Sequence, residues 1–226
     1  MEDETGLRVR PAARPGQPRE SLAQAAYAAL KASILETLLP PGHEAVEQAI
    51  ADQLGMSRTP VHEAVLRLQH EGFLQVLPRR GVRVLPIDPT DLRETYDVLV
   101  ALEGAAAGAA ATAAMATATE DMAQALAAGD RKGWAAADDR FHRTLLEGGG
   151  NAKLARLGQT AADQAQRARS ATAARRPDPT TSIAEHAAIL AALRQGQPDA
   201  ARLAVAAHRR RASEEILRVL GILPLG

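Results

Sequence analysis

Apolar residues recur at helical spacing in three stretches near the start of the chain. The first stretch predicts a helix that Pro40-Pro41-Gly42 terminates, and its apolar stripe is Leu22, Ala26, Leu30, Ile34 and Leu38. A shorter amphipathic helix is predicted over residues 47–54, and Gly55 breaks it. Val61, Val65 and Leu68 then give the apolar stripe of a third helix, with Pro60 in its first turn. Helix, glycine-containing turn and second helix form a helix-turn-helix, whose second helix enters the DNA major groove.

Short β-branched or apolar runs follow this unit over residues 73–77 and 82–85. They flank Pro78-Arg79-Arg80-Gly81 and predict a β-hairpin with two arginines at its tip. Residues 1–19, in contrast, are rich in Pro, Arg and Glu and lack apolar periodicity, so we expect a flexible tail there.

The second half of the chain shows helical periodicity and no strand-like alternation. Pro86-Ile87-Asp88-Pro89 marks the boundary, where Asp88 can cap a new helix. The spacing Ser182-Ile183-Ala184-Glu185 is that of a capping box at a later helix start. We expect helices over residues 89–116, 119–128, 130–148, 151–173, 182–195 and 198–220. The fold class is therefore predicted as mainly α, with an all-helical bundle of six or seven helices over residues 87–226.

Composition narrows the class of protein further. The absence of cysteine excludes disulfides and thiolate metal sites. No apolar run approaches the roughly 20 residues of a membrane span, and the N-terminus lacks the order of a signal peptide, so we expect a cytoplasmic protein. The formal net charge is zero, but between Met56 and Leu85 five arginines face two acidic residues. This local basic patch favours DNA binding.

Three predicted inward stripes of the bundle carry polar groups among apolar ones. Asp138 and His142 lie four residues apart on one helix face, and His186 and His208 lie on two later helices. Burying such groups without partners costs several kcal/mol, so they should meet one another or an ion. Three imidazoles and one carboxylate suit zinc, nickel, manganese or iron and leave coordination positions open. The alternative is a hydrogen-bonded cluster without metal.

Two sets of motifs resemble a known family. "LPPGHEAVEQAIADQ", "LGMSRTPVHEAVLRLQHEGFL" and "PRRGVRVLP" resemble, in order, the winged helix-turn-helix of GntR transcription regulators, here over residues 20–86. "DDRFHRTLLEGGGNAKL", "AEHAAILAALRQGQPDAA" and "AVAAHRRRA" resemble the FCD subgroup, whose ligand-binding domain is all-helical. That subgroup's Asp-x-x-x-His pair falls on Asp138 and His142, and its two later histidines fall on His186 and His208. The resemblance implies a homodimer in which the metal helps to hold a small carboxylic acid.

The expected function is that of a DNA-binding transcription regulator, most often a repressor in this family. Two recognition helices would enter successive major grooves about 34 Å apart on a near-palindromic operator. Arg58 is expected to contact a base edge, because arginine can bind guanine through two hydrogen bonds. The other expected DNA-binding residues are Ser57, Thr59, His62 and Gln48, with Arg79 and Arg80 on phosphates at the wing. Glu103, Arg143 and Asn151 are candidates for the effector pocket.

Two positions depart from the family pattern, and two other functions stay open. Many members carry arginine where this chain has His62, and members often place an arginine at the position of Leu99. A direct metal sensor is one alternative. A helical metalloenzyme is the other, since an open metal site can activate water. Glu103 is the one inward candidate for a general base, and no glycine-rich phosphate loop or nucleophile elbow occurs, so we expect no enzymatic activity.

Overall fold

The computed structural model describes residues 8–11, 22–107 and 112–221. The chain divides into two compact units, Met1–Ile87 and Asp88–Gly226, which we call the N-terminal and C-terminal units. Most of the predicted flexible tail, residues 1–19, lies outside the described residues. Of the part that is described, the Val9 backbone N–H donates a hydrogen bond to Gln53 Oε1 at 3.0 Å.

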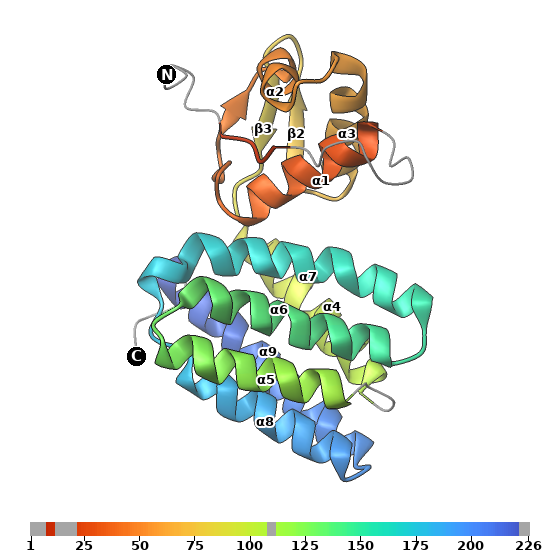
Figure 1. Cartoon of the computed structure of the whole chain (residues 1–226), viewed down its shortest axis with the longest axis vertical. Helices are drawn as coiled ribbons and strands as arrows, with labels where there is room; N and C mark the ends of the chain where they lie inside the picture. Colours follow the sequence, from red (N-terminus) through yellow and green to blue (C-terminus); the bar gives the residue numbers. More distant parts are fainter. Residues whose placement is uncertain (1–7, 12–21, 108–111, 222–226) are drawn as a thin grey trace. The chain divides into compact units, whose positions relative to one another are not determined.

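The N-terminal unit contains three helices and a small antiparallel sheet (Figure 1). The helices are α1 (Leu22–Leu35), α2 (Glu47–Leu54) and α3 (Arg58–His70), and the strands are β1 (Glu44–Ala45), β2 (Leu74–Leu77) and β3 (Gly81–Val84). The strand order is β1-β3-β2. The three helices and the hairpin of the winged helix-turn-helix are therefore confirmed. Strand β1 was not predicted, because two residues are too few to show alternation.

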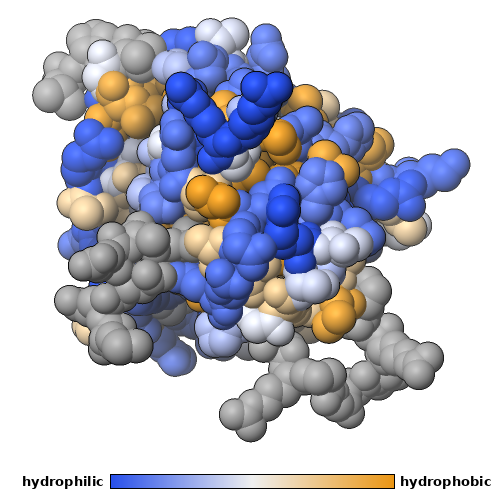
Figure 2. Space-filling model, turned by 90° about the horizontal axis from the view of Figure 1, so that it is seen from above, coloured by the Kyte–Doolittle hydropathy of each residue, from blue (hydrophilic) through white to orange (hydrophobic). Residues whose placement is uncertain are grey.

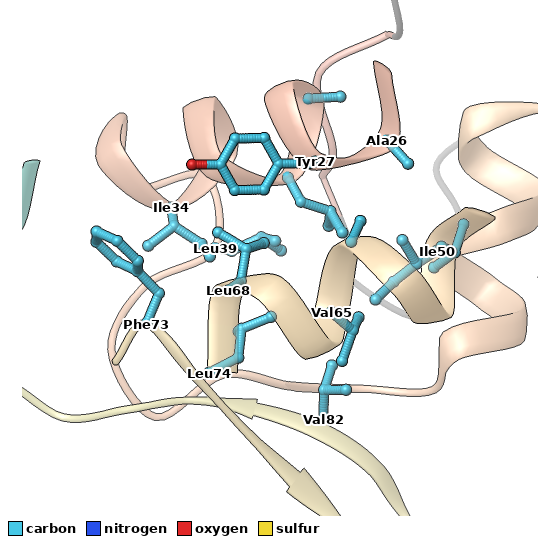
Figure 3. Close-up of a cluster of buried hydrophobic side chains, with 14 of the residues drawn as sticks. Ala26, Tyr27, Ile34, Leu39, Ile50, Val65, Leu68, Phe73, Leu74 and Val82 are labelled. Carbon is cyan, nitrogen blue, oxygen red and sulfur yellow. The ribbon is translucent and has the colours of Figure 1, made fainter. Parts of the chain in front are cut away.

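Apolar side chains dominate the core of the N-terminal unit, where Ser33 is the one buried polar residue among those described. Figure 3 shows Tyr27 and Ile34 of α1, Val65 and Leu68 of α3, and Phe73 before the hairpin turned toward one another. Their rings and branched chains close the space between the helices and the sheet, which leaves the opposite side of α3 to solvent. The spacing of the stripe along α3 therefore fixes which of its side chains face outward.

The described residues of the C-terminal unit form six α-helices and one 3-10 turn. They are α4 (Pro89–Ala106), α5 (Thr112–Ala127), α6 (Arg131–Gly148), α7 (Ala152–Thr172), η1 (Ala173–Arg175), α8 (Thr180–Arg194) and α9 (Pro198–Val219). The predicted mainly α fold class is confirmed. Asp88 caps α4 as expected, because its Oδ1 accepts hydrogen bonds from the N–H groups of Thr90 and Asp91.

Two local predictions about these helices were wrong. The single helix expected over 89–116 is divided, since α4 ends at Ala106 and α5 begins at Thr112. This alanine-rich run contains few large apolar residues that could mark where one helix face stops. The capping box is also absent, because α8 begins two residues earlier and Pro179 is its N-cap residue without a side-chain hydrogen bond. Ser182 and Glu185 instead bind α9, as described below.

The six helices pack in a ring, each against the next, in the order α4, α9, α8, α5, α6, α7 and back to α4. In Figure 1, α7, α6, α5 and α8 run side by side, with α4 and α9 behind them. Helix α6 also packs across the ring against α4. The inward faces of α6, α8 and α9 therefore meet in the interior. Across the described residues, no helix is both long enough and apolar enough to cross a membrane.

Candidate metal centre and nucleic-acid interface

Four side chains predicted as metal ligands come together inside the C-terminal unit. Asp138 and His142 of α6, His186 of α8 and His208 of α9 each offer one ligand atom, and these atoms lie within 4.8 Å of one another. All four residues are buried. The spacing of four along α6 stacks its two ligands on one inward face, and the ring of helices supplies the other two.

The three imidazoles point their Nε2 atoms at one another. His142 Nε2 lies 3.1 Å from His186 Nε2 and 3.2 Å from His208 Nε2, and His186 Nε2 lies 3.5 Å from Asp138 Oδ1. Two nitrogens bound to one zinc ion at its usual bond lengths are about 3.3 Å apart in tetrahedral geometry. The observed spacing therefore fits ligands that share one ion.

Carboxylates behind two of the rings favour the tautomers that a metal requires. His208 Nδ1 is 2.7 Å from Glu185 Oε2, and His142 Nδ1 is 3.3 Å from Glu103 Oε1. A proton on His208 Nδ1 faces Glu185 and leaves a lone pair on Nε2, whereas His142 Nδ1 lies beside Glu103 without a hydrogen bond to it. The arrangement is compatible with a metal site that has carboxylates behind two of its ligands. The Nε2 contacts of His142 with His186 and His208 also have hydrogen-bond geometry, so a hydrogen-bonded cluster is the alternative.

The protonation states of the cluster agree with this reading. Burial lowers the pKa of His142 well below its ordinary value, and burial together with the nearby His208 lowers the pKa of His186 to about 3. Burial alone would raise the pKa of Asp138, but the Arg169 guanidinium, 2.9 Å from its Oδ2, holds that pKa well below its usual range. Both rings are thus neutral and the carboxyl is ionised at neutral pH, which is the state that binds a metal ion.

Four arginines surround the cluster, and the sequence had not identified them as part of the site. Arg209 is fully buried and pairs through two hydrogen bonds with Glu103. Arg211 bonds both oxygens of Glu185 and the hydroxyl of Ser182. The remaining two are Arg169 on Asp138 and Arg176 on Glu215. A run of three arginines after His208 looks like a solvated helix surface, and only the position of Arg209 next to a ligand hinted at burial.

The three predicted effector-pocket residues have different surroundings. Glu103 lies beside His142, as the helical stripe of α4 suggested. Arg143 pairs with Asp139, four residues before it on the same helix. Asn151 caps α7 by accepting hydrogen bonds from the N–H groups of Lys153 and Leu154. Arg143 therefore pairs within helix α6, and Asn151 caps the start of α7.

The start of α3 presents the predicted base-contacting residues to solvent. Ser57 is the N-cap residue without a side-chain capping bond, and Arg58, Thr59 and His62 are exposed. His62 Nδ1 lies 3.2 Å from Glu47, which holds the ring against α2. On α2, Gln48 is exposed and donates to Asp52, one turn further along. The His62–Glu47 contact thus joins the start of α3 to the start of α2, and the second helix of such units is the one that enters the major groove.

The wing places its two arginines at an exposed turn. Arg79 has a positive φ of 63°, and both Arg79 and Arg80 are exposed. Arg83 on β3 instead pairs with Glu44 on β1, so it belongs to the sheet. Gly81 (φ 105°) follows the turn, and any Cβ there would collide with the carbonyl oxygen of Ala45.

Figure 2 shows a surface on which hydrophilic residues predominate and hydrophobic ones form scattered spots.

Two family models match the chain in the order that the fold suggests. Residues 22–84 match the gntR family of bacterial regulatory proteins, and residues 94–211 match the FCD domain. The second match alone covers more than half of the chain, and it contains all four clustered residues.

Named relatives and solved structures agree with these matches. The chain is 48% identical over 132 residues to an HTH-type transcriptional regulator in the TAR-I ttuE-ttuC′ intergenic region of Agrobacterium vitis, covering 54% of this chain and 77% of that protein. It is 27% identical over 198 residues to an HTH-type transcriptional regulator in an unstable DNA locus of Streptomyces ambofaciens, covering 85% and 84%.

Among solved structures, E. coli McbR/YncC shares the fold with a TM-score of 0.76 at 21% identity, over 88% of this chain and 99% of that one. A GntR regulator from Rhodococcus sp. RHA1 gives a TM-score of 0.73 at 21% identity, over 89% and 98%. The fold of the chain is thus shared with both of these structures. The chain belongs to the GntR family of bacterial transcription regulators, in the subgroup that carries an FCD domain.

Proposed function

We propose that this chain is a homodimeric repressor whose affinity for its operator is controlled by a small organic acid bound at a metal ion in the C-terminal unit. The observation that carries the proposal is the convergence of three imidazoles and one carboxylate in a buried centre. Because the DNA-binding residues lie on the other unit, the centre is a place for a signal and not for DNA contact.

Repression is proposed from the relatives. The chain is 36% identical over 129 residues to a probable D-xylose utilization operon transcriptional repressor of Paenarthrobacter nicotinovorans. It is 32% identical over 95 residues to the HTH-type transcriptional repressor RspR of Escherichia coli K12. Two copies would place two α3 helices in successive major grooves of a near-palindromic operator, with Arg58 on a base edge and Arg79 and Arg80 on phosphates. A protein with this task works in the cytoplasm, where the chromosome lies.

The metal would be held by Asp138, His142, His186 and His208. The donor set suits zinc, and nickel, manganese or iron bind such nitrogen and oxygen ligands as well. When bound, the ion supplies an electrophile with open positions for a carboxylate. Glu103 and Glu185 orient the His142 and His208 rings, and Arg169 keeps Asp138 ionised.

Three different helices carry the ligands, which suggests how a signal could spread. An acid that binds between α6, α8 and α9 favours one packing of these helices over another. It changes operator affinity only if it binds the two packings unequally. A change of about 10- to 100-fold in DNA affinity requires only about 1–3 kcal/mol of such coupling.

The test combines metal analysis with DNA binding on the full chain. We expect about one transition-metal ion per chain, and release of operator DNA by an organic acid in a band-shift assay. His186→Ala and His208→Ala should lower the metal content while operator binding without acid stays measurable. Unchanged metal content in both variants would defeat the four-ligand site. A response of operator binding to the metal alone would instead indicate a direct metal sensor, and turnover of the acid would indicate an enzyme.

A further inference from the structure

Buried polar atoms beside the cluster identify a second anion-binding region. Tyr96 Oη, Arg209 Nη1 and Arg176 Nε are buried and have no hydrogen-bond partner among the described residues. Tyr96 is 2% exposed and Arg209 is 1% exposed. A buried polar group without a partner costs about 1–3 kcal/mol, so three such donors in one place call for an acceptor.

These donors lie close together and close to the cluster. The Arg209 guanidinium carbon is 5.9 Å from the centre of the Tyr96 ring. Arg176 donates from Nη2 to the carbonyl oxygen of Arg169, whose own guanidinium touches Asp138. Burial raises the pKa of Tyr96, and the charges of Arg169, Arg209 and Arg176 act against that rise. The three donors thus come from three parts of the bundle, with Tyr96 on α4, Arg209 on α9 next to the ligand His208, and Arg176 in the α7–α8 connection.

The charges around the cluster balance before a metal ion is added. Its ion pairs join four arginines to four carboxylates, and these pairs are Arg169–Asp138, Arg176–Glu215, Arg209–Glu103 and Arg211–Glu185. A divalent ion therefore brings two positive charges into a buried site with no negative charge left to offset them. An uncompensated buried charge is strongly unfavourable, so the bound effector should itself carry two negative charges.

We propose that the effector is a dicarboxylic acid, with one carboxylate at the metal and the other held by Tyr96, Arg176 and Arg209. This inference rests on the proposed function and specifies the ligand class of the same site. Two separate acid groups are required, because the metal ligands and the three donors are different sets of atoms. Arg176 lies between α7 and α8, so binding of the second carboxylate would also tie this connection to the metal centre.

The deciding experiment measures binding of defined acids to the full, zinc-loaded chain by titration calorimetry. Malonate, succinate and glutarate are compared with their monomethyl esters, with propionate and with inorganic phosphate. We expect one of the diacids to bind at least about tenfold more tightly than its own half-ester, which corresponds to about 1.4 kcal/mol. Phosphate carries its charge on a single group and should bind no better than the half-ester.

Variants then locate the second carboxylate. Arg176→Gln and Tyr96→Phe should each remove most of the advantage of the diacid over its half-ester. Arg175→Gln is the matched control, because the neighbouring Arg175 is exposed and bonds only the Val219 carbonyl among the contacts described. It should keep the full advantage. Equal loss in all three variants would overturn the assignment of Arg176 and Tyr96.

The inference and the proposed function fail in different ways. A chain that binds metal and DNA, and that binds the half-esters or propionate as tightly as every diacid, keeps the proposed function and overturns the dicarboxylate. A chain that binds zinc but none of these acids also overturns it. A chain without metal, or without operator binding, overturns the proposed function itself.

Discussion

The cores of the two units differ in the kind of side chain that they bury. The N-terminal core is built from apolar side chains such as Phe73 and Leu68, and its candidate functional residues lie outside on α3 and the wing. The C-terminal core contains a buried ion pair, Arg209–Glu103, and three buried histidines. In the first unit, the candidate functional side chains are exposed and are not part of the core that stabilises the fold. In the second unit, the same buried side chains contribute to stability and form the candidate metal centre. A substitution that lowers the stability of this unit should therefore also change its metal binding.

The largest expected effect comes from breaking the buried ion pair. Glu103→Ala leaves the Arg209 charge buried without its partner, which should lower the free energy of unfolding of the C-terminal unit by about 3–5 kcal/mol. The fluorescence of Trp134, the only tryptophan, measures this in urea because the side chain is buried on α6.

The double variant Glu103→Leu with Arg209→Met should recover most of the stability, since apolar pairs often replace buried ion pairs without loss. It should still bind metal about 10- to 100-fold more weakly, because Glu103 no longer orients His142. Full metal affinity in the double variant would mean that the pair serves stability alone.

A cavity in the apolar core should have a smaller and purely structural effect. Leu68→Ala removes a side chain that is fully buried between α1 and the sheet, and should cost about 2–5 kcal/mol in the N-terminal unit. Far-ultraviolet circular dichroism in urea should show the loss, while the Trp134 transition and the metal content stay as in the unchanged protein. A shift of the Trp134 transition would show that the two units unfold together and would weaken the contrast between them.

Surface function in the N-terminal unit should separate from stability. Arg58→Ala should weaken specific operator binding by about 1–3 kcal/mol, because a two-bond contact to guanine is lost. Its unfolding free energy should change by less than about 0.5 kcal/mol, since Arg58 is exposed. Arg67→Ala on the same helix is the control, because Arg67 bonds Glu71 and Gln24 and lies over the Tyr27 ring. That variant should lose stability and keep operator specificity, and the reverse outcome would exchange the two roles.

The smallest expected effect concerns acid. Burial alone would raise the pKa of Glu71, but hydrogen bonds from Lys31 and Tyr27 lower it below the ordinary 4.5. A lowered pKa in the folded state gives stability that is present above pH 4.5 and is lost as the pH falls through the folded value. Glu71→Gln should therefore unfold with a flatter pH dependence below that pH, measured by circular dichroism. Parallel acid profiles would show that Glu71 contributes nothing through its charge.

The sequence predicted what depends on regular spacing. Helical periodicity located the helices of both units, and inward histidines on separate stripes led to the cluster at Asp138. Glu185 shows the limit of this approach, because its spacing from Ser182 matched a capping box while the side chain bonds His208 and Arg211. The spacing of residues within α8 cannot show that α9 packs against the face that carries Glu185. The contacts of Arg176 were equally hidden, since it lies in a connection without periodicity and pairs with Glu215 of α9 and the Arg169 carbonyl of α7.

The order of the ligands along the chain has a consequence for how each molecule matures. His142 is separated by 44 residues from His186 and by 66 from His208, so the centre forms only after α8 and α9 have docked on α6. The N-terminal unit has its own core within the first 87 residues and needs none of these helices. Because domains generally fold in order as they leave the ribosome, each new molecule acquires helix α3 and the wing before the buried cluster of the C-terminal unit. Under the proposed function, the supply of metal during synthesis would then decide how many of these molecules can respond to an effector.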